Sequence, residues 1–100
     1  MEQPPIAVKV KFMGDLLALI EQRNLSMTLP QGSTVGDLLA LLNESYGEPF
    51  YSRVFVRPDT LHHYMLIFVD GQNINDIGGL AATLGESKVE IIMLPMFEGG

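Results

Sequence analysis

The 100-residue sequence contains no cysteine. It therefore has no disulfide framework, no thiolate metal site and no cysteine nucleophile, which suits a reducing cytosol. Basic residues are also few, because six Lys and Arg stand against twelve Asp and Glu and give a net charge of −6. Nucleic acids and anionic membranes repel such a chain, so we expect neither as a partner and expect basic protein surfaces instead. The six cations are scattered along the sequence and predict no basic stripe.

Long apolar runs are absent as well, and none approaches the roughly 18 residues that span a bilayer. Residues 1–5 lack the basic region and the apolar core of a signal peptide. Hydrophobic residues nevertheless make up 47% of the chain, enough for the core of one domain over residues 1–100. We therefore expect a soluble, cytoplasmic protein that binds no cofactor and is not an enzyme by itself.

Metal ligands are scarce too. His62 and His63 are adjacent, so on an extended segment they point to opposite sides, and two ligands are too few for a zinc site. We interpret them as loop histidines and expect no metal site.

Four segments have the composition of β-strands, at residues 6–12, 25–29, 65–69 and 88–94. The turn residues at 30–33 indicate that the first two strands lie in one sheet. The order of elements, with the helix described next, predicts an α+β fold with a mixed four- to five-stranded sheet on one main helix.

Thr34 and Asp37 have the spacing of a capping box and predict a helix over residues 34–46, which Gly47 ends. This is the clearest helix in the sequence. Residues 13–24 hold several leucines and predict one or two further helical turns.

The remaining segments are predicted to be irregular. Residues 50–64 indicate a loop with a short strand, and this loop and residues 1–5 are predicted to be dispensable because they lack periodic apolar positions. Asp70-Gly71 is a tight-turn signal, after which residues 72–76 are predicted to be irregular. Residues 77–84 predict a turn or a short helix.

The last strand predicts two different faces. Val89, Ile91 and Met93 share one face and are expected in the core, beneath the helix. One helix covers only one face of a sheet, so Ile92 and Leu94 on the other face are expected to form an interface with a partner.

The sequence ends in a tail, residues 95–100, that closes with Gly99 and Gly100. Glycine has no Cβ, so a Gly-Gly end can pass through a channel that any side chain would block, and its terminal carboxylate is unhindered. The competing interpretation is an ordinary frayed terminus.

Three motifs together resemble a known family. They are Gly32-Ser-Thr-Val-Gly-Asp-Leu-Leu39, Phe68-Val-Asp-Gly71, and the closing segment from Gly79-Leu-Ala-Ala-Thr-Leu84 through Lys88–Pro95 to Gly99-Gly100. They resemble the ubiquitin-like β-grasp sulfur carriers of the MoaD/ThiS family, which includes the molybdopterin synthase small subunit and the thiamine-pathway carrier.

The resemblance implies that a separate adenylating enzyme uses ATP to activate Gly100, which then becomes a thiocarboxylate and donates sulfur, with molybdopterin biosynthesis as the leading pathway. Implied partners are that ubiquitin-activating-like enzyme, a molybdopterin synthase large subunit-like protein and a sulfurtransferase. Alternatives are a protein modifier conjugated through Gly100, a carrier for thiamine or another sulfur metabolite, and a non-catalytic interaction module. The residues expected to contact partners are Ile92, Leu94, Met96, Phe97 and Glu98.

Overall fold

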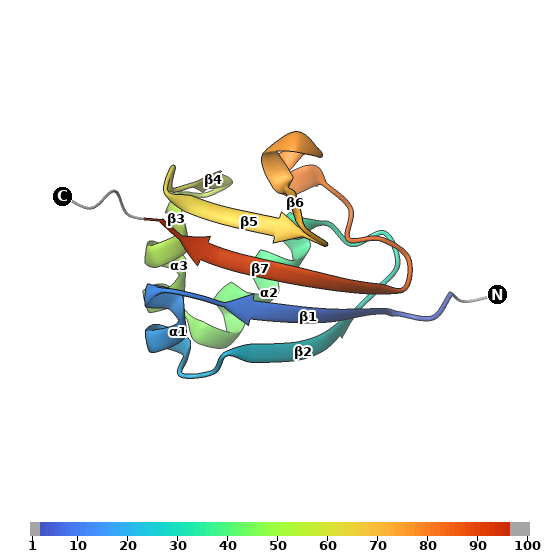
Figure 1. The fold of residues 1–100 in the computed structure, drawn as a ribbon, viewed down its shortest axis with the longest axis horizontal. Coiled ribbons are helices and arrows are strands. Elements are labelled where there is room, and N and C mark those ends of the chain that lie inside the picture. Colours follow the sequence, from blue (N-terminus) through green and yellow to red (C-terminus); the bar gives the residue numbers. More distant parts are fainter. Residues whose placement is uncertain (1–2, 97–100) are drawn as a thin grey trace.

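A five-stranded mixed sheet lies at the centre of the structure, a computed structural model that describes residues 3–96 (Figure 1). The strands lie in the order β2-β1-β7-β5-β6, so the first and last strands are neighbours in the middle of the sheet. β1 and β7 are parallel, and the other neighbouring pairs of this sheet are antiparallel. The bounds of the strands are Ile6–Phe12 (β1), Asn24–Leu29 (β2), Met65–Val69 (β5), Gln72–Asn73 (β6) and Lys88–Pro95 (β7).

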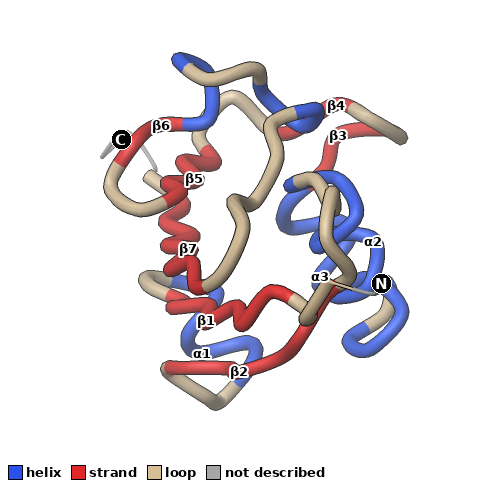
Figure 2. The backbone as a smooth tube through the Cα atoms, turned by 90° about the vertical axis from the view of Figure 1, so that its right-hand side faces the viewer, coloured by secondary structure: helices blue, strands red, loops and turns tan. Residues whose placement is uncertain are grey.

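Helices cover one face of this sheet (Figure 1), and the view along the strands shows α2 and α3 together on that side (Figure 2). The helices are α1 (Asp15–Ile20), α2 (Val35–Tyr46) and α3 (Glu48–Val54). Two single 3₁₀ turns, η1 (Ile74–Asp76) and η2 (Gly79–Ala81), follow β6. The predicted α+β fold class is therefore confirmed. Over residues 3–96, none of the helices has the length and apolar composition needed to cross a membrane.

The main helix begins where the sequence predicts, because Thr34 and Asp37 form the two reciprocal hydrogen bonds of a capping box. The Thr34 hydroxyl accepts a hydrogen bond from the Asp37 amide at 3.2 Å, and the Asp37 carboxylate accepts one from the Thr34 amide at 2.9 Å. These bonds satisfy amide groups that the helix itself leaves unpaired. The helix ends at Gly47, whose φ of 75° lies in the region that favours glycine.

The core fills the space between the sheet and the helices. Alternate residues of the strands point into it, and in β7 these include Ile91 and Met93, both fully buried as predicted. The helices contribute the buried side chains Leu16, Ile20, Val35, Leu38, Leu39, Leu42, Phe50 and Val54.

The segment predicted to be a dispensable loop, residues 50–64, is instead part of this core. Phe50 and Val54 are fully buried on one face of α3, four residues apart, which is the spacing of neighbours on a helix. The chain then forms a separate two-stranded sheet from β3 (Phe55–Arg57) and β4 (Thr60–Leu61). The prediction was wrong because a helix of two turns shows only two apolar positions, too few to establish a period.

Two further boundaries differ from the sequence prediction. Asp70 and Gly71 form the expected tight turn, both with positive φ (48° and 86°), but the turn continues into the short strand β6 instead of irregular chain. β7 also extends through Pro95, which lies opposite Met65 and is buried. The tail assigned to residues 95–100 therefore begins no earlier than Met96.

Candidate functional site

The face of the sheet that the helices leave open carries an apolar patch on two neighbouring strands. Leu66 of β5 lies opposite Leu94 of β7, and Phe68 lies opposite Ile92. All four side chains are only half-buried, whereas their neighbours on the other face are in the core. We call these four residues the apolar patch. Ile92 and Leu94 lie on the open face, as the alternation in their strand indicates, and the sheet adds Leu66 and Phe68 to them. Their contact with a partner stays a prediction.

The point where the tail leaves the sheet is held on both sides. The Met96 amide donates a hydrogen bond to the Tyr64 carbonyl at 2.7 Å, next to β5. The Met13 amide donates one to the Met93 carbonyl at 3.0 Å, beyond the end of β1. The tail therefore starts from a fixed point beside Leu94, at the edge of the apolar patch.

The backbone conformation beside this point favours a glycine. Gly14 has a φ of +60°, and a Cβ built on it would lie 3.5 Å from the Pro95 side chain. The space is adequate for a methyl group, but the backbone conformation is one that other residues rarely adopt. Gly14 thus lets the chain turn out of β1 against the last residue of β7.

Two exposed methionines lie at this root of the tail. Met13 is 42% exposed and Met96 is 54% exposed, and both belong to the few large hydrophobic side chains exposed in the part of the chain that the structure describes. Methionine adapts its shape to irregular apolar surfaces. Met96 was predicted as a partner contact, whereas Met13 was missed because it stands in a segment with no periodic pattern.

The other predicted site residues fall at the end of the chain. Phe97, Glu98, Gly99 and Gly100 lie outside the described residues. Their proposed roles therefore remain predictions, and the structure contributes the position of the strand from which they extend.

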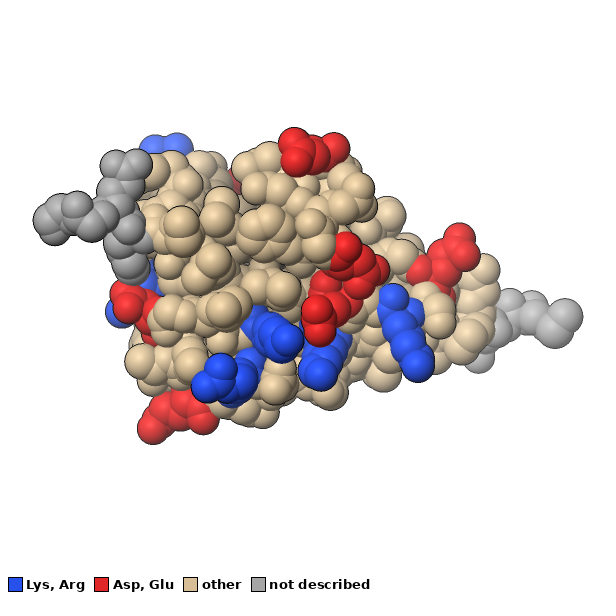
Figure 3. Space-filling model, viewed as in Figure 1, with Lys and Arg blue, Asp and Glu red and all other residues tan. Residues whose placement is uncertain are grey.

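The three lysines lie together in space although Lys88 is far from Lys9 and Lys11 in the sequence, whereas Arg53 and Arg57 lie on α3 and β3. All three lysines of the chain lie on the open face, since Lys9 and Lys11 alternate with inward residues of β1 and Lys88 pairs with Ala7. Figure 3 shows basic side chains gathered over this part of the sheet, beside a small acidic group. The sequence could not reveal this, because the neighbours β1 and β7 are at opposite ends of the chain.

His62 has a structural role. The His62 ring lies with Nε2 3.0 Å from the Ser52 carbonyl oxygen, and it stacks on the Tyr64 ring with centroids 4.8 Å apart. These contacts join the end of β4 to α3 and to the start of β5. Within residues 3–96, no group of three or more His, Asp or Glu side chains is arranged to hold a metal ion.

The order and pairing of the strands, with the helices on one face of the sheet, define a ubiquitin-like β-grasp fold. No family model and no curated protein sequence matches the chain. Among solved structures, small archaeal modifier protein 1 (SAMP1) from Methanosarcina acetivorans has 29% sequence identity and a TM-score of 0.77, covering 97% of this chain and 99% of its own.

Two further structures extend this comparison. A putative molybdopterin converting factor, subunit 1, from Pyrococcus furiosus has 22% identity and a TM-score of 0.71, covering 92% of this chain and 99% of its own. The Amycolatopsis orientalis BexX/CysO complex has 20% identity and a TM-score of 0.74, covering 94% of this chain and 100% of its own. The structural neighbours thus fall in the general class of ubiquitin-like sulfur carriers and protein modifiers.

Proposed function

We propose that the protein is a sulfur carrier and that the carboxylate of Gly100 is its reactive group. The observation that carries this proposal is the root of the tail. β7 ends beside the apolar patch, and two hydrogen bonds hold its last residues, so a partner docked on the open face receives the tail at a defined place. A reacting end delivered in a fixed orientation gains much of its rate from proximity alone.

The chemistry requires a second protein. A carboxylate is a poor electrophile, so ATP must first convert it to an acyl-adenylate with release of pyrophosphate. A persulfide sulfur from a sulfurtransferase then attacks the acyl carbon and displaces AMP, and a thiol reduces the resulting acyl disulfide to the thiocarboxylate. The carrier contributes the slim end of its chain and the surface on which the enzyme binds.

We further propose that the thiocarboxylate serves molybdopterin synthesis in the cytoplasm, with a synthase large subunit as the second protein that binds the open face. The likeness to the Pyrococcus furiosus putative molybdopterin converting factor supports this pathway. The solved complex of CysO with BexX supports the more general expectation that a carrier of this shape binds another protein.

The second candidate is a protein modifier, in which the activated Gly100 is joined to a lysine of a target protein. The specific observation in its favour is the 29% identity to the Methanosarcina acetivorans modifier protein, which exceeds the two other identities given above. Mass spectrometry of the protein from its native cell separates the two functions. A gain of about 16 Da, which replacement of oxygen by sulfur produces, indicates a thiocarboxylate. A branched peptide in which the carboxyl end of this chain is joined to a lysine of another protein indicates a modifier.

The decisive experiment measures ATP-dependent pyrophosphate release with the adenylating enzyme of the same cell. Three forms are compared: the full chain, a chain without Gly99 and Gly100, and a chain with one residue added after Gly100. The truncated carboxylate ends roughly 7 Å short, at about 3.3–3.6 Å per extended residue, so we expect no turnover. The added residue moves the carboxylate and places bulk near it, so we expect almost none.

Folding stability serves as the control in this experiment, because glycines at a free end bury little surface. All three forms should therefore unfold at nearly the same temperature. Equal turnover by the three forms would overturn the carrier proposal and would favour a β-grasp interaction module without chemistry.

A further inference from the structure

The open face of this acidic protein carries its lysines in one band. In the register between β1 and β7, Ala7 lies opposite Lys88, Lys9 opposite Glu90, and Lys11 opposite Ile92. Lys9 and Lys88 are exposed, and Lys11 is half-buried. We call Lys9, Lys11 and Lys88 the lysine band. It adjoins the apolar patch where Lys11 meets Ile92, so the two form one continuous surface.

Most of this positive charge is not neutralised within the protein. Lys11 Nζ lies 4.0 Å from Glu90 Oε2, a long contact between side chains that are 40% and 44% exposed. Over residues 3–96 the one other ion pair joins Arg53 to Asp15 on the helices, so Lys9 and Lys88 have no ion-pair partner there. An exposed pair such as Lys11–Glu90 contributes little to stability. The lysine band is therefore available to charges of another molecule.

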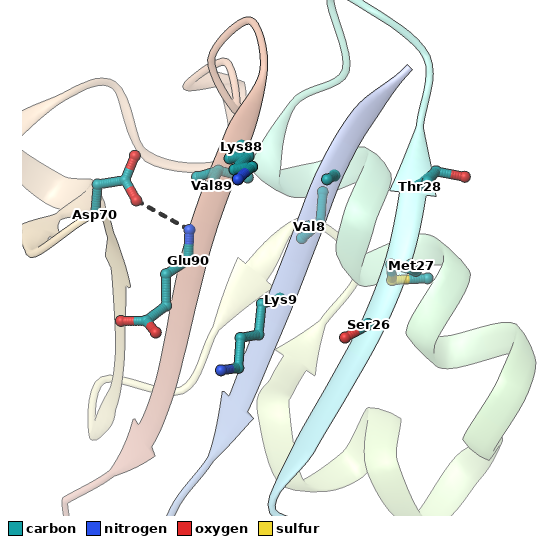
Figure 4. A pocket seen from close by; sticks show the side chains of 10 residues that line it. Val8, Lys9, Ser26, Met27, Thr28, Asp70, Lys88, Val89 and Glu90 are labelled. Carbon is teal, nitrogen blue, oxygen red and sulfur yellow. Dashed lines mark hydrogen bonds between the residues drawn. The ribbon is translucent and has the colours of Figure 1, made fainter. Parts of the chain in front are cut away.

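Two of the three lysines, Lys9 and Lys88, line a hollow of about 540 Å³ on the open face. The small residues Ala7, Ser26 and Thr28 also line it. Figure 4 shows Lys9 on β1 and Lys88 on the neighbouring strand β7. On the β5 side, the Asp70 carboxylate accepts a hydrogen bond from the Glu90 amide at 2.9 Å and is directed toward the backbone (Figure 4). The hollow thus has room for a side chain of a partner, with cations within reach.

We propose that the lysine band binds an acidic surface of the adenylating enzyme and so orients the protein for delivery of its tail. This inference rests on the proposed function and adds the chemistry of the partner surface. The apolar patch alone can hold the protein on the enzyme but does not fix its orientation there, because apolar contacts are non-directional. Charges on one side of the patch set the direction, because the reversed arrangement would place the enzyme's acidic groups against apolar side chains.

An acidic protein surface fits the band better than a nucleic acid does. A nucleic acid presents a continuous line of phosphates, and the net charge of −6 opposes its approach. Glu90 also lies among the lysines, opposite Lys9 in the register, and would face those phosphates. A protein surface can place its carboxylates at Lys9 and Lys88 and avoid Glu90.

The test compares two substitutions that change the charge equally. Lys9→Glu alters the band, and Arg57→Glu alters an exposed cation of β3, which lies in the other sheet. The full chain and its adenylating enzyme are studied by calorimetry for Kd and by pyrophosphate release for KM and kcat, at low and at raised salt. We expect Lys9→Glu to raise Kd and KM about tenfold and to leave kcat unchanged, and its Kd should depend less on salt. Lys9→Arg keeps the charge and should remain near the parent in all three constants. Arg57→Glu should stay within about twofold of the parent in both constants.

The outcomes separate the two proposals. Normal pyrophosphate release with equal Kd for Lys9→Glu and Arg57→Glu overturns the lysine band and leaves the carrier function intact. Lysine-dependent binding without pyrophosphate release supports the band and overturns the function. No binding of the parent chain, or self-association of the chain that Lys9→Glu abolishes in sedimentation, overturns the assignment of the band to the enzyme.

Discussion

The two faces of the central sheet are built from the same strands and differ in what covers them. On the covered face, β7 presents Ile91, which is fully buried beneath the helices. On the open face the next residue, Ile92, is half-buried beside Phe68 and next to Lys11. The same strands therefore bury one face in the core and leave apolar and basic side chains partly exposed on the other, although the residue types in the strand are similar.

The largest loss of stability is expected from a core residue of the helices that cover the sheet. Phe50→Ala removes a fully buried ring that packs against Tyr46, with centroids 5.9 Å apart. We expect the free energy of unfolding to fall by about 3–5 kcal/mol, measured by urea denaturation. A loss below about 1 kcal/mol would mean that α3 contributes little to the core and that residues 50–64 are dispensable after all.

The neighbouring isoleucines of β7 test the comparison directly, because one is the matched control of the other. Ile91→Ala opens a cavity in the core and should cost about 2–5 kcal/mol of unfolding free energy. Ile92→Ala removes a half-buried side chain from the open face and should cost about 1 kcal/mol. Equal losses in thermal unfolding would show that something also covers the open face.

A smaller effect is expected at the start of α2. Thr34→Ala removes the hydroxyl that accepts a hydrogen bond from the Asp37 amide. We expect the free energy of unfolding to fall by about 1 kcal/mol. Thr34→Ser keeps the hydroxyl and should retain most of the stability. If both variants unfold with the parent, the cap contributes nothing and packing against the sheet alone holds the helix.

The smallest effect on folding, and a large one on recognition, is expected from Leu94→Glu. The side chain is half-buried on the open face, so we expect less than about 1 kcal/mol of lost stability. The Kd for the adenylating enzyme should rise about tenfold or more, since a charge is placed in an apolar contact. Val56→Glu is the control, because Val56 is 51% exposed in the other sheet. A fall of several kcal/mol in Leu94→Glu would show that this residue belongs to the core.

Local patterns in the sequence were sufficient for much of the fold. Alternation identified β1, β2 and β7, and the Thr34–Asp37 spacing identified the start of α2, because hydrogen bonds and periodicities of this kind lie within a few residues. α3 and β6 were missed because two turns and two residues are too short for a period to appear.

The residues of the candidate site likewise divide into those that the sequence predicted and those that it did not. Alternation within one strand was enough to predict that Ile92 and Leu94 face away from the core. That Leu66 and Phe68 join them, and that Lys9 and Lys88 form one band, follows from the pairing of strands in the folded protein and could not be predicted. The pairing of β7 with β1 and β5 brings together side chains that are far apart in the sequence. Alternation within a strand fixes the face on which each side chain lies, but it does not say which strand will be its neighbour.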